Sequence, residues 1–376
     1  MSNYKAFEKL INLLESLQKD ISHRIRKCTL KGLLCQKILE LSLQLGTKPS
    51  TSLFNRISMV NVTSQSVNRF EHKIPLNILN LIRTTVNSYQ LPKGKRVFAV
   101  DGTRLALNRS IAESDPQYRL TPSKSYTDAL LTTIYNVDQK IPYGWHLSGH
   151  HNERKGFLAI LNDVARGDTV IFDRGYYSQE LVTNLERKGI HYIFRLKMNS
   201  KLSRLEGDDV IIKGSQRRAF YRIKGTTYSL LSNLGSKIAI NKLGDLYHSR
   251  WKIEEWYKTL KTQLKGKFYP QKTLLRVQQK LEWQQIVYSV HRLLCQDATK
   301  VSEMKKSQNI SSLYVAQNAI EIAKCIYHQK WELLENMIVF LRYNCISIEV
   351  KGRHYPRKGI IDGGKWYRGK GLVNNG

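Results

Sequence analysis

A stripe of chemically active side chains runs along the segment Tyr247–Lys261, which reads YHSRWKIEEWYKTLK. Steps of three and four residues separate its members, Tyr247, Arg250, Glu254, Lys258 and Lys261. At roughly 100° per residue, this spacing predicts one helix with all five side chains within an arc of about 80°. The acid suits a metal ligand and the cations suit phosphates, while Trp251, near the edge of the arc, could stack on a base.

A plainer interpretation treats the stripe as a solvated helix face. Arg250 and Glu254 would then form an ordinary i, i+4 ion pair worth a few tenths of a kcal/mol. The neighbouring arc is apolar and would face a core in either interpretation. A solvated face leaves unexplained two aspartates that lie elsewhere in the chain.

These two aspartates follow predicted buried strands. The apolar run Val97–Val100 precedes Asp101, and the run Val170–Phe172 precedes Asp173. Ligands bind at the carboxyl ends of strands in open α/β sheets. Three carboxylates that converge there with Glu254 would repel one another, and a hard divalent cation such as Mg²⁺ relieves this repulsion. Two such ions can clamp a phosphodiester during in-line displacement. The sequence therefore predicts a metal site formed by all three acids.

The composition indicates a polyanionic partner. The chain has 376 residues, with 61 Lys and Arg against 30 Asp and Glu, which gives a net charge of +31. Nucleic acid is the commonest partner that screens so large a charge. No apolar run approaches the ~20 residues of a membrane-spanning helix. The N-terminus lacks the features of a signal peptide, and five cysteines without a CxxC pair suit a reducing compartment. We expect a cytoplasmic protein associated with DNA, with no membrane partner.

The chain divides into three predicted regions. Residues 1–92 carry helix-period leucines and are predicted to be a helical, DNA-binding region. Within them, segments 50–57 and 63–74 resemble a helix-turn-helix, although plain bundle packing explains them equally well. Residues 93–300 form the predicted catalytic domain, and residues 301–376 the helical C-terminal region. A basic tail, 351–370, ends the sequence.

The middle region shows an α/β pattern. Two strands meet at a predicted turn around 138–140, and the strand before Asp173 leads into a predicted helix over 178–188. Another strand, HYIFRLKM, follows. Residues 198–240 are short, turn-rich and strand-like, which predicts a small β insertion ahead of the stripe-bearing helix.

The chain resembles transposases of the bacterial insertion sequence 4 family. The spacing Tyr247-x2-Arg250-x3-Glu254-x6-Lys261 matches the Y-(2)-R-(3)-E-(6)-K signature of that family. FAVDGT and VIFDRGY are similar to its two aspartate motifs, and GRHYPRKG is similar to the basic ends of such proteins. The resemblance covers roughly residues 95–300.

The resemblance implies an RNase H-like core with a β insertion between the second aspartate and the glutamate. Asp101, Asp173 and Glu254 would be its catalytic, metal-binding triad. Tyr247, Arg250, Trp251, Lys258 and Lys261 would contact DNA. The implied activity is cut-and-paste transposition with Mg²⁺, for which Mn²⁺ can substitute. The implied partners are double-stranded DNA, as terminal inverted repeats and target DNA, and a second copy of the chain in a synaptic homodimer.

Other interpretations remain open. A metal-dependent nuclease without strand transfer would carry the same metal site, and a non-catalytic DNA-binding descendant would not need all three acids. His146, His150 and His151 lack a fourth soft ligand for zinc. Glu153 could approach the acidic cluster, but an acid that simply favours a helix N-terminus accounts for it more readily.

Overall fold

The fold is described by a computed structural model of the chain. It describes residues 4–21, 28–42, 50–91, 94–120, 125–223, 225–236, 238–300, 308–344, 346–348, 361–362 and 365–366. The predicted basic tail therefore lies outside the described residues, apart from two short paired strands, β12 (Ile361–Asp362) and β13 (Lys365–Trp366).

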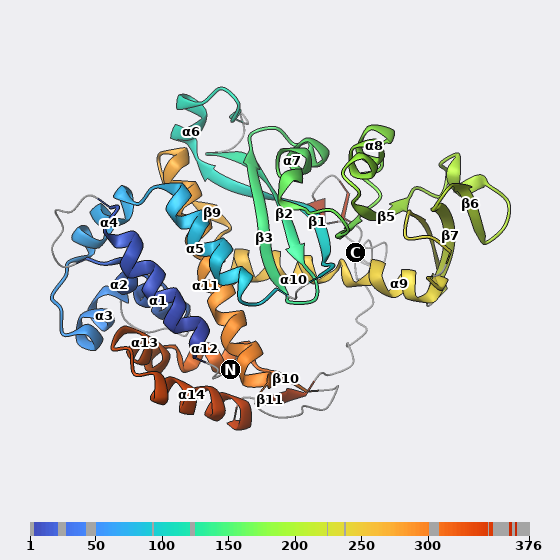
Figure 1. The fold of residues 1–376 in the computed structure, drawn as a ribbon. Coiled ribbons are helices and arrows are strands. Elements are labelled where there is room, and N and C mark those ends of the chain that lie inside the picture. The colour runs from blue at the N-terminus through green and yellow to red at the C-terminus, as the bar shows by residue number, and fades with distance from the viewer. Residues whose placement is uncertain are drawn as a thin grey trace, which may run out of the picture.

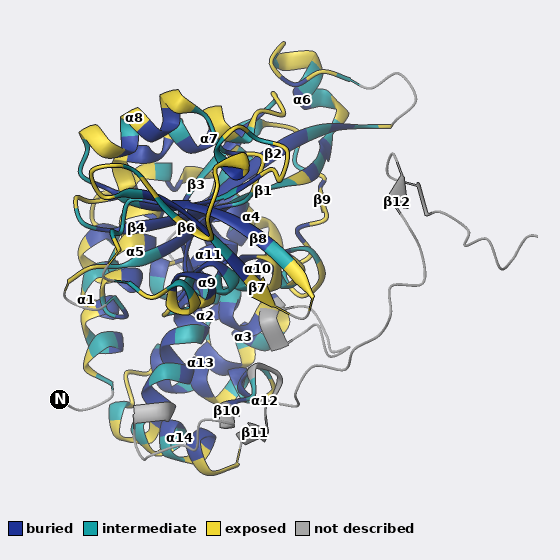
Figure 2. Ribbon diagram, turned by 90° about the vertical axis from the view of Figure 1, so that its right-hand side faces the viewer, coloured by how far each residue is buried: buried dark blue, intermediate teal, exposed yellow. Residues whose placement is uncertain are grey.

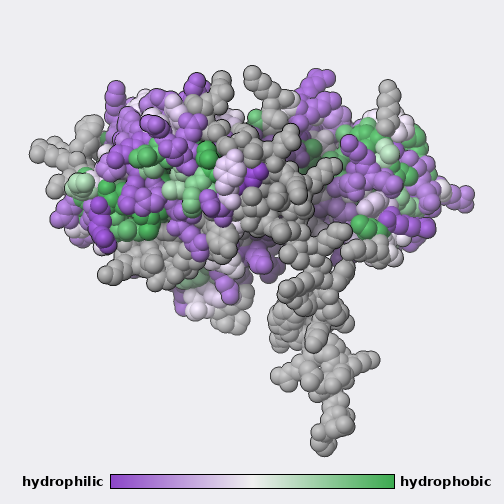
Figure 3. All heavy atoms as spheres, turned by 90° about the horizontal axis from the view of Figure 1, so that it is seen from below, coloured by the Kyte–Doolittle hydropathy of each residue, from purple (hydrophilic) through white to green (hydrophobic). Residues whose placement is uncertain are grey.

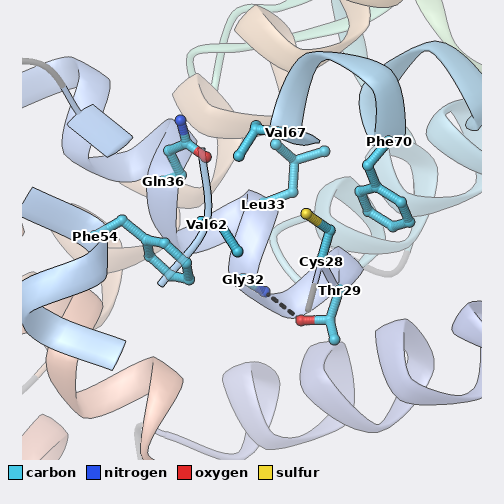
Figure 4. Close-up of a pocket in the computed structure, with 9 residues that line it drawn as sticks. All are labelled: Cys28, Thr29, Gly32, Leu33, Gln36, Phe54, Val62, Val67 and Phe70. Atoms are coloured by element: carbon cyan, nitrogen blue, oxygen red, sulfur yellow. Dashed lines mark hydrogen bonds between the residues drawn. The ribbon is translucent and has the colours of Figure 1, made fainter. Parts of the chain in front are cut away.

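The N-terminal region is helical, as predicted. It contains α1 (Lys5–Gln18), α2 (Leu30–Ser42), α3 (Ser50–Ser58), α4 (Ser64–Lys73) and α5 (Leu76–Ser88). Thr63 caps α4 by accepting a hydrogen bond from the Ser66 N–H at 3.1 Å, which fits the preference of helix N-caps for hydroxyl side chains. The inner faces of α2, α3 and α4 leave a cavity of about 10 Å³ (Figure 4). This space is large enough for one water molecule at most and marks a packing gap.

Both ends of the chain share one helical core. The C-terminal helices are α11 (Leu274–Lys300), α12 (Ser312–Gln317), α13 (Ala319–Tyr327) and α14 (Trp331–Asn344), and β10 (Gln308–Ile310) pairs with β11 (Ile346–Ile348). They pack beside α1–α5 (Figure 1). Phe7, Leu79, Ile286 and Ile322 are completely or almost completely buried in this core. The predicted domain boundaries at 92 and 300 stay predictions.

A nine-stranded sheet forms the second unit of the described chain. Its strands are β1 (Val97–Asn108), β2 (Tyr126–Asn136), β3 (Ile141–Ser148), β4 (Thr169–Phe172), β5 (His191–Leu196), β6 (Asp209–Lys213), β7 (Gln216–Ile223), β8 (Thr226–Ser232) and β9 (Phe268–Tyr269). Their order is β3-β2-β1-β4-β5-β8-β7-β6, with β9 against β1. The β1–β4 and β4–β5 pairs are parallel. The predicted insertion thus extends the sheet itself, because β8 pairs with β5.

Helices cover both faces of this sheet. The remaining helices are α6 (Arg109–Ser114), α7 (Glu153–Ala159), α8 (Gln179–Arg187), α9 (Ile240–Ser249) and α10 (Lys252–Thr262), with short 3₁₀ turns at Leu161–Asp163 and Leu202–Arg204. Alternate side chains of β1 point to opposite faces. Phe98 packs with Phe157 of α7, whereas Ala99 packs with Trp256 of α10. The strands between these layers are mostly buried (Figure 2).

Two predicted elements differ from the structure. β1 does not end before Asp101 but continues to Asn108, because its second half pairs with β2. The segment 247–261 is two helices rather than one. The N–H groups of Arg250 and Trp251 each bond to a carbonyl three residues back, so the chain tightens into a 3₁₀-like turn between α9 and α10. The tighter turn means that the five stripe residues do not follow one uniform helical arc.

The described surface is largely hydrophilic. Seen from below, polar side chains cover much of it, with smaller apolar patches between them (Figure 3). Among the described residues, no helix combines the length and the apolar character that a bilayer span requires.

A buried ion pair joins the helical core to the sheet. Arg83 of α5 donates from Nε to Glu282 Oε2 of α11 at 2.8 Å, and the two side chains are 6% and 5% exposed. Trp145 of β3 donates to the other Glu282 oxygen at 3.1 Å. Glu282 therefore holds three elements together.

Replacing Glu282 with alanine is expected to destabilise the protein. The change leaves Arg83 buried without its counter-ion, which typically costs about 3–5 kcal/mol. Urea denaturation followed by circular dichroism measures the loss. Glu113→Ala is the matched control because its pair with Arg109 is exposed, so the change should cost less than about 1 kcal/mol. Equal, small losses in both variants would contradict the role of Glu282.

Candidate active site

Parallel pairing places Asp101 and Asp173 side by side. Val100 of β1 is in register with Phe172 of β4, and each aspartate is the next residue of its chain. The parallel pairing ends at this point, while β1 continues alongside β2 with Asp101 opposite Thr133. Asp101, within β1, and Asp173, just after β4, thus lie side by side where the parallel pairing ends.

Arg250 links Asp101 to Glu254. It lies in the turn between α9 and α10 and is only 5% exposed. Its Nη1 donates to Asp101 Oδ2 at 3.2 Å, and its Nη2 donates to Glu254 Oε1 at 2.9 Å. Glu254 itself is largely exposed at the start of α10. The guanidinium therefore holds together two of the three predicted acids.

Asp173 is held by a different pair of residues. The buried Tyr247 hydroxyl donates to Asp173 Oδ1 at 3.2 Å, and Arg195 Nη1 lies 3.7 Å from the same oxygen. Burial raises the pKa of Tyr247 to about 12, and the charge of Asp173 adds to this, so the hydroxyl remains a donor at neutral pH. The Arg195 guanidinium also stacks on the Tyr228 ring of β8, 4.8 Å from its centre.

The surroundings of Asp101 favour its neutral form. The pKa of Asp101 is raised to about 6, mainly by burial and also by the charges of Glu153 and Glu254, whereas Arg250 and the Gly102 N–H act in the opposite direction. The Gly102 N–H donates to Asp101 Oδ1 at 3.0 Å. Because the pKa in the folded chain exceeds the ordinary 3.8, ionised Asp101 opposes folding above pH 6.

Asp101→Asn is expected to stabilise the metal-free protein at pH 8. A shift of about two pKa units corresponds to at most about 3 kcal/mol, which the neutral amide recovers. The gain should shrink as the pH falls through 6 and be absent near pH 4, where aspartate is protonated in both states. Denaturation in chelator at pH 8 and pH 5 measures this difference. Asp138→Asn, in the exposed β2–β3 turn, is the control. A loss of stability at pH 8 would contradict the unfavourable environment described for ionised Asp101.

The donor chemistry of this edge fits a divalent cation. Carboxylate oxygens are the ligands that Mg²⁺ prefers, and a cation would favour the ionised form of Asp101, which burial and the neighbouring acids disfavour by raising its pKa. Among the described residues, no three acidic, histidine or cysteine side chains are already close enough to hold a metal ion. Arg250 is bound between Asp101 and Glu254. The metal-ligand role of the triad stays a prediction.

The remaining residues of the predicted stripe lie nearer to solvent. Trp251 is 49% exposed and Lys258 is also exposed. Lys261 is half-buried, and burial together with the charge of Lys267 lowers its pKa. These three residues are accessible to a ligand in a way that Tyr247 and Arg250 are not.

Sequence reasoning missed Arg195, whereas Glu153 lies at a helix N-terminus, as the sequence indicated. Arg195 is a cation within an apolar strand, and that contrast could have drawn attention to it. It lines a cleft of about 340 Å³ together with Arg174, Leu196, Lys197, Met198, Asn199, Thr227 and Ser229. Arg174, the residue after Asp173, lines the cleft. The cationic side chains of the cleft therefore lie next to the acidic edge.

Residues 92–290, more than half of the chain, match the family described as Transposase DDE domain. The chain belongs to this family. The matched stretch contains both strand-borne aspartates, Glu254 and the turn that carries Arg250. It also contains every strand from β1 to β9.

One relative supports this membership of the Transposase DDE domain family. A putative transposase for insertion sequence element IS4SA, from Synechocystis sp., is 25% identical over 144 residues, or 35% of this chain. The match spans 42% of that relative. The resemblance to insertion sequence 4 transposases is thus confirmed, whereas the four-residue signature stays a prediction.

The fold is also shared with a solved transposase. The cryo-EM structure of the piggyBac transposase synaptic complex with hairpin DNA superposes with a TM-score of 0.50 at 13% identity. The superposition covers 94% of this chain and 86% of that one. The predicted α/β, RNase H-like fold is confirmed.

Proposed function

We propose that this protein is a cut-and-paste transposase. It cleaves double-stranded DNA at terminal inverted repeats and joins the freed 3′ ends to target DNA. One observation carries the proposal: the register of β1 and β4 sets Asp101 beside Asp173, and Arg250 ties Glu254 to the same edge. This edge lies within the stretch that matches the transposase family.

The acids would hold Mg²⁺, or Mn²⁺ in its place. When bound, the cation would neutralise charge on the scissile phosphate and on the attacking and leaving oxygens. Arg250 orients Asp101 and Glu254, and Tyr247 orients Asp173. Both residues would also contact DNA phosphates beside these acids, as the family resemblance implies.

DNA would approach along the exposed cations beside the acids. Lys258, Lys261 and Trp251 flank Glu254 on and before α10, and Arg174 and Lys197 line the cleft on the other side of Asp173. In the N-terminal region, α4 presents exposed Gln65 and Arg69, which would assist end recognition. The active form would be a synaptic homodimer that holds both element ends.

Lys261→Ala is expected to weaken end binding and to reduce the salt dependence of that binding. Each neutralised phosphate contributes about 0.9 to the log–log slope of affinity against salt on duplex DNA, so the slope should fall by about one. Lys258→Ala should have a smaller effect. Fluorescence anisotropy of labelled duplex at several KCl concentrations measures both. Lys324→Ala, which removes an exposed partner of Glu321 in the helical core, should leave the slope unchanged. An unchanged slope for Lys261→Ala would contradict the predicted phosphate contact.

The proposed function is tested by following the joined products. The protein is mixed with Mg²⁺, a linear duplex that carries the DNA flanking its gene, and a circular target plasmid. We expect cleavage at inverted repeats, joining of 3′ ends to the plasmid, and a short duplication of target sequence at each junction. Cleavage without joining would indicate a nuclease. The absence of both cleavage and joining would overturn the proposal. Replacing Mg²⁺ with Ca²⁺ should stop cleavage, since Ca²⁺ accepts looser coordination.

A further inference from the structure

A fourth carboxylate reaches the acidic edge from the opposite face of the sheet. Glu153 is the first residue of α7, which follows the capping residue Asn152. Helix α7 crosses the sheet at close range because Gly156 lies against Thr132 of β2, where a Cβ atom would be 2.2 Å from the threonine hydroxyl oxygen. This packing brings the first turn of α7 to the middle of β1.

Glu153 lies directly over Gly102, the residue after Asp101. A Cβ atom at Gly102 would be 2.8 Å from Glu153 Cγ and 2.9 Å from its Oε1. Only glycine leaves room for the carboxylate, which gives a physical reason for the glycine in FAVDGT. The side chain is half-buried. An acid that merely favoured a helix N-terminus would not need this contact with β1.

The position is electrostatically unfavourable without a further cation. The Asp101 and Glu153 carboxylates both lie beside Gly102, so two acids of like charge meet at one position. In the described part of the chain, no lysine or arginine forms an ion pair with Glu153, because Arg250 binds Asp101 and Glu254 instead. Asp101, Glu153 and Glu254 therefore share the charge of the single Arg250 guanidinium.

A buried hydroxyl lies at the same place. Tyr176 is 1% exposed, and its hydroxyl interacts with the Glu153 carboxylate without forming a hydrogen bond of normal geometry within the described residues. Asp101 is a second charged neighbour of this hydroxyl. Two carboxylates and a hydroxyl therefore meet at one buried position, which is an arrangement that suits a polar ligand.

The geometry points to Glu153 as a fourth acidic residue of the divalent-cation site, acting with Asp101 and Asp173 from the α7 side. Glu254 stands on the other side, exposed and bound to Arg250. The inference rests on the proposed function, since it assumes that the acidic edge binds a metal. It goes beyond that function because the triad alone would not include α7.

The test is Mn²⁺ binding by the full-length protein, read from the electron paramagnetic resonance signal of free Mn²⁺. Glu153→Gln should weaken affinity at least about tenfold, the loss typical for groups that support a metal site. Asp173→Asn should also weaken it. Glu255→Gln, one residue after Glu254 and exposed on α10, should bind like the wild type. Circular dichroism and melting temperature confirm that each variant is folded.

A second variant guards against an effect of the glutamine itself. Gly102→Ala should displace the Glu153 carboxylate without removing it and should weaken Mn²⁺ binding to a similar extent. If Asp173→Asn loses affinity while Glu153→Gln and Gly102→Ala retain it, the role of Glu153 is overturned and the proposed metal site stands. If Asp173→Asn binds Mn²⁺ normally, the metal site fails and the role of Glu153 fails with it.

Discussion

Glu254→Gln should reduce DNA cleavage at element ends by about 1,000-fold or more while leaving end binding intact. The amide preserves the shape of the side chain and removes the negative charge that would hold the metal. A bound metal supplies several kcal/mol of transition-state stabilisation, and each 1.36 kcal/mol corresponds to a factor of ten in rate. Single-turnover cleavage of labelled end duplex in Mg²⁺ measures the rate, and anisotropy measures binding.

The adjacent Glu255 provides the control for this variant. It lies in the same first turn of α10 and is exposed like Glu254, but no contact joins it to Arg250 or to the aspartates. Glu255→Gln should therefore cleave at nearly the wild-type rate. If Glu254→Gln also kept its activity, Glu254 would be no more than one partner of a surface ion pair.

Arg250→Ala should lower the cleavage rate by about 100-fold or more. The guanidinium makes one charge-assisted hydrogen bond to Asp101 and one to Glu254, each worth about 1.5–3 kcal/mol. Losing both leaves two acids of the site without orientation and without a counter-charge. Arg250→Lys should not restore the rate, because a single ammonium cannot reproduce the planar, two-armed contact.

Single-turnover rates at saturating DNA separate this positioning role from a simple contact with DNA. If Arg250 only bound phosphate, saturating DNA would restore the rate of Arg250→Ala, and the salt slope would fall by about one. We expect the rate to stay low at saturation. Full recovery at high DNA concentration would contradict the role that its burial between two acids indicates.

Local sequence signals were sufficient to predict the framework of the site. Short apolar runs before Asp101 and Asp173 marked buried strands, and the β2–β3 turn and Ser178 at the start of α8 carried ordinary turn and cap residues. These features depend on neighbouring residues alone. The prediction that each aspartate directly follows a buried apolar run came from them.

The rest of the site depends on contacts between distant segments. β1 extends beyond Asp101 because β2 supplies a partner, which strand propensity does not encode. Arg250 is buried where it forms ion pairs with acids on two elements. At the same residue, the chain between α9 and α10 tightens into a 3₁₀-like turn. The approach of Glu153 to Gly102 depends on how α7 crosses the sheet. The sequence correctly indicated that Glu153 lies at a helix N-terminus, but that local signal does not encode the contact with β1.

The most direct test of the metal site is the position of Mn²⁺ in a complex with element-end DNA. Crystals of this complex, with data collected at a wavelength where manganese scatters anomalously, would locate the ion independently of the protein atoms. We predict an anomalous peak within coordination distance of the Asp101 and Asp173 carboxylates and of the phosphate that is cut. A DNA end bound with that phosphate away from β1 and β4, or a manganese peak elsewhere only, would contradict the assignment of Asp101, Asp173 and Glu254 as one catalytic centre.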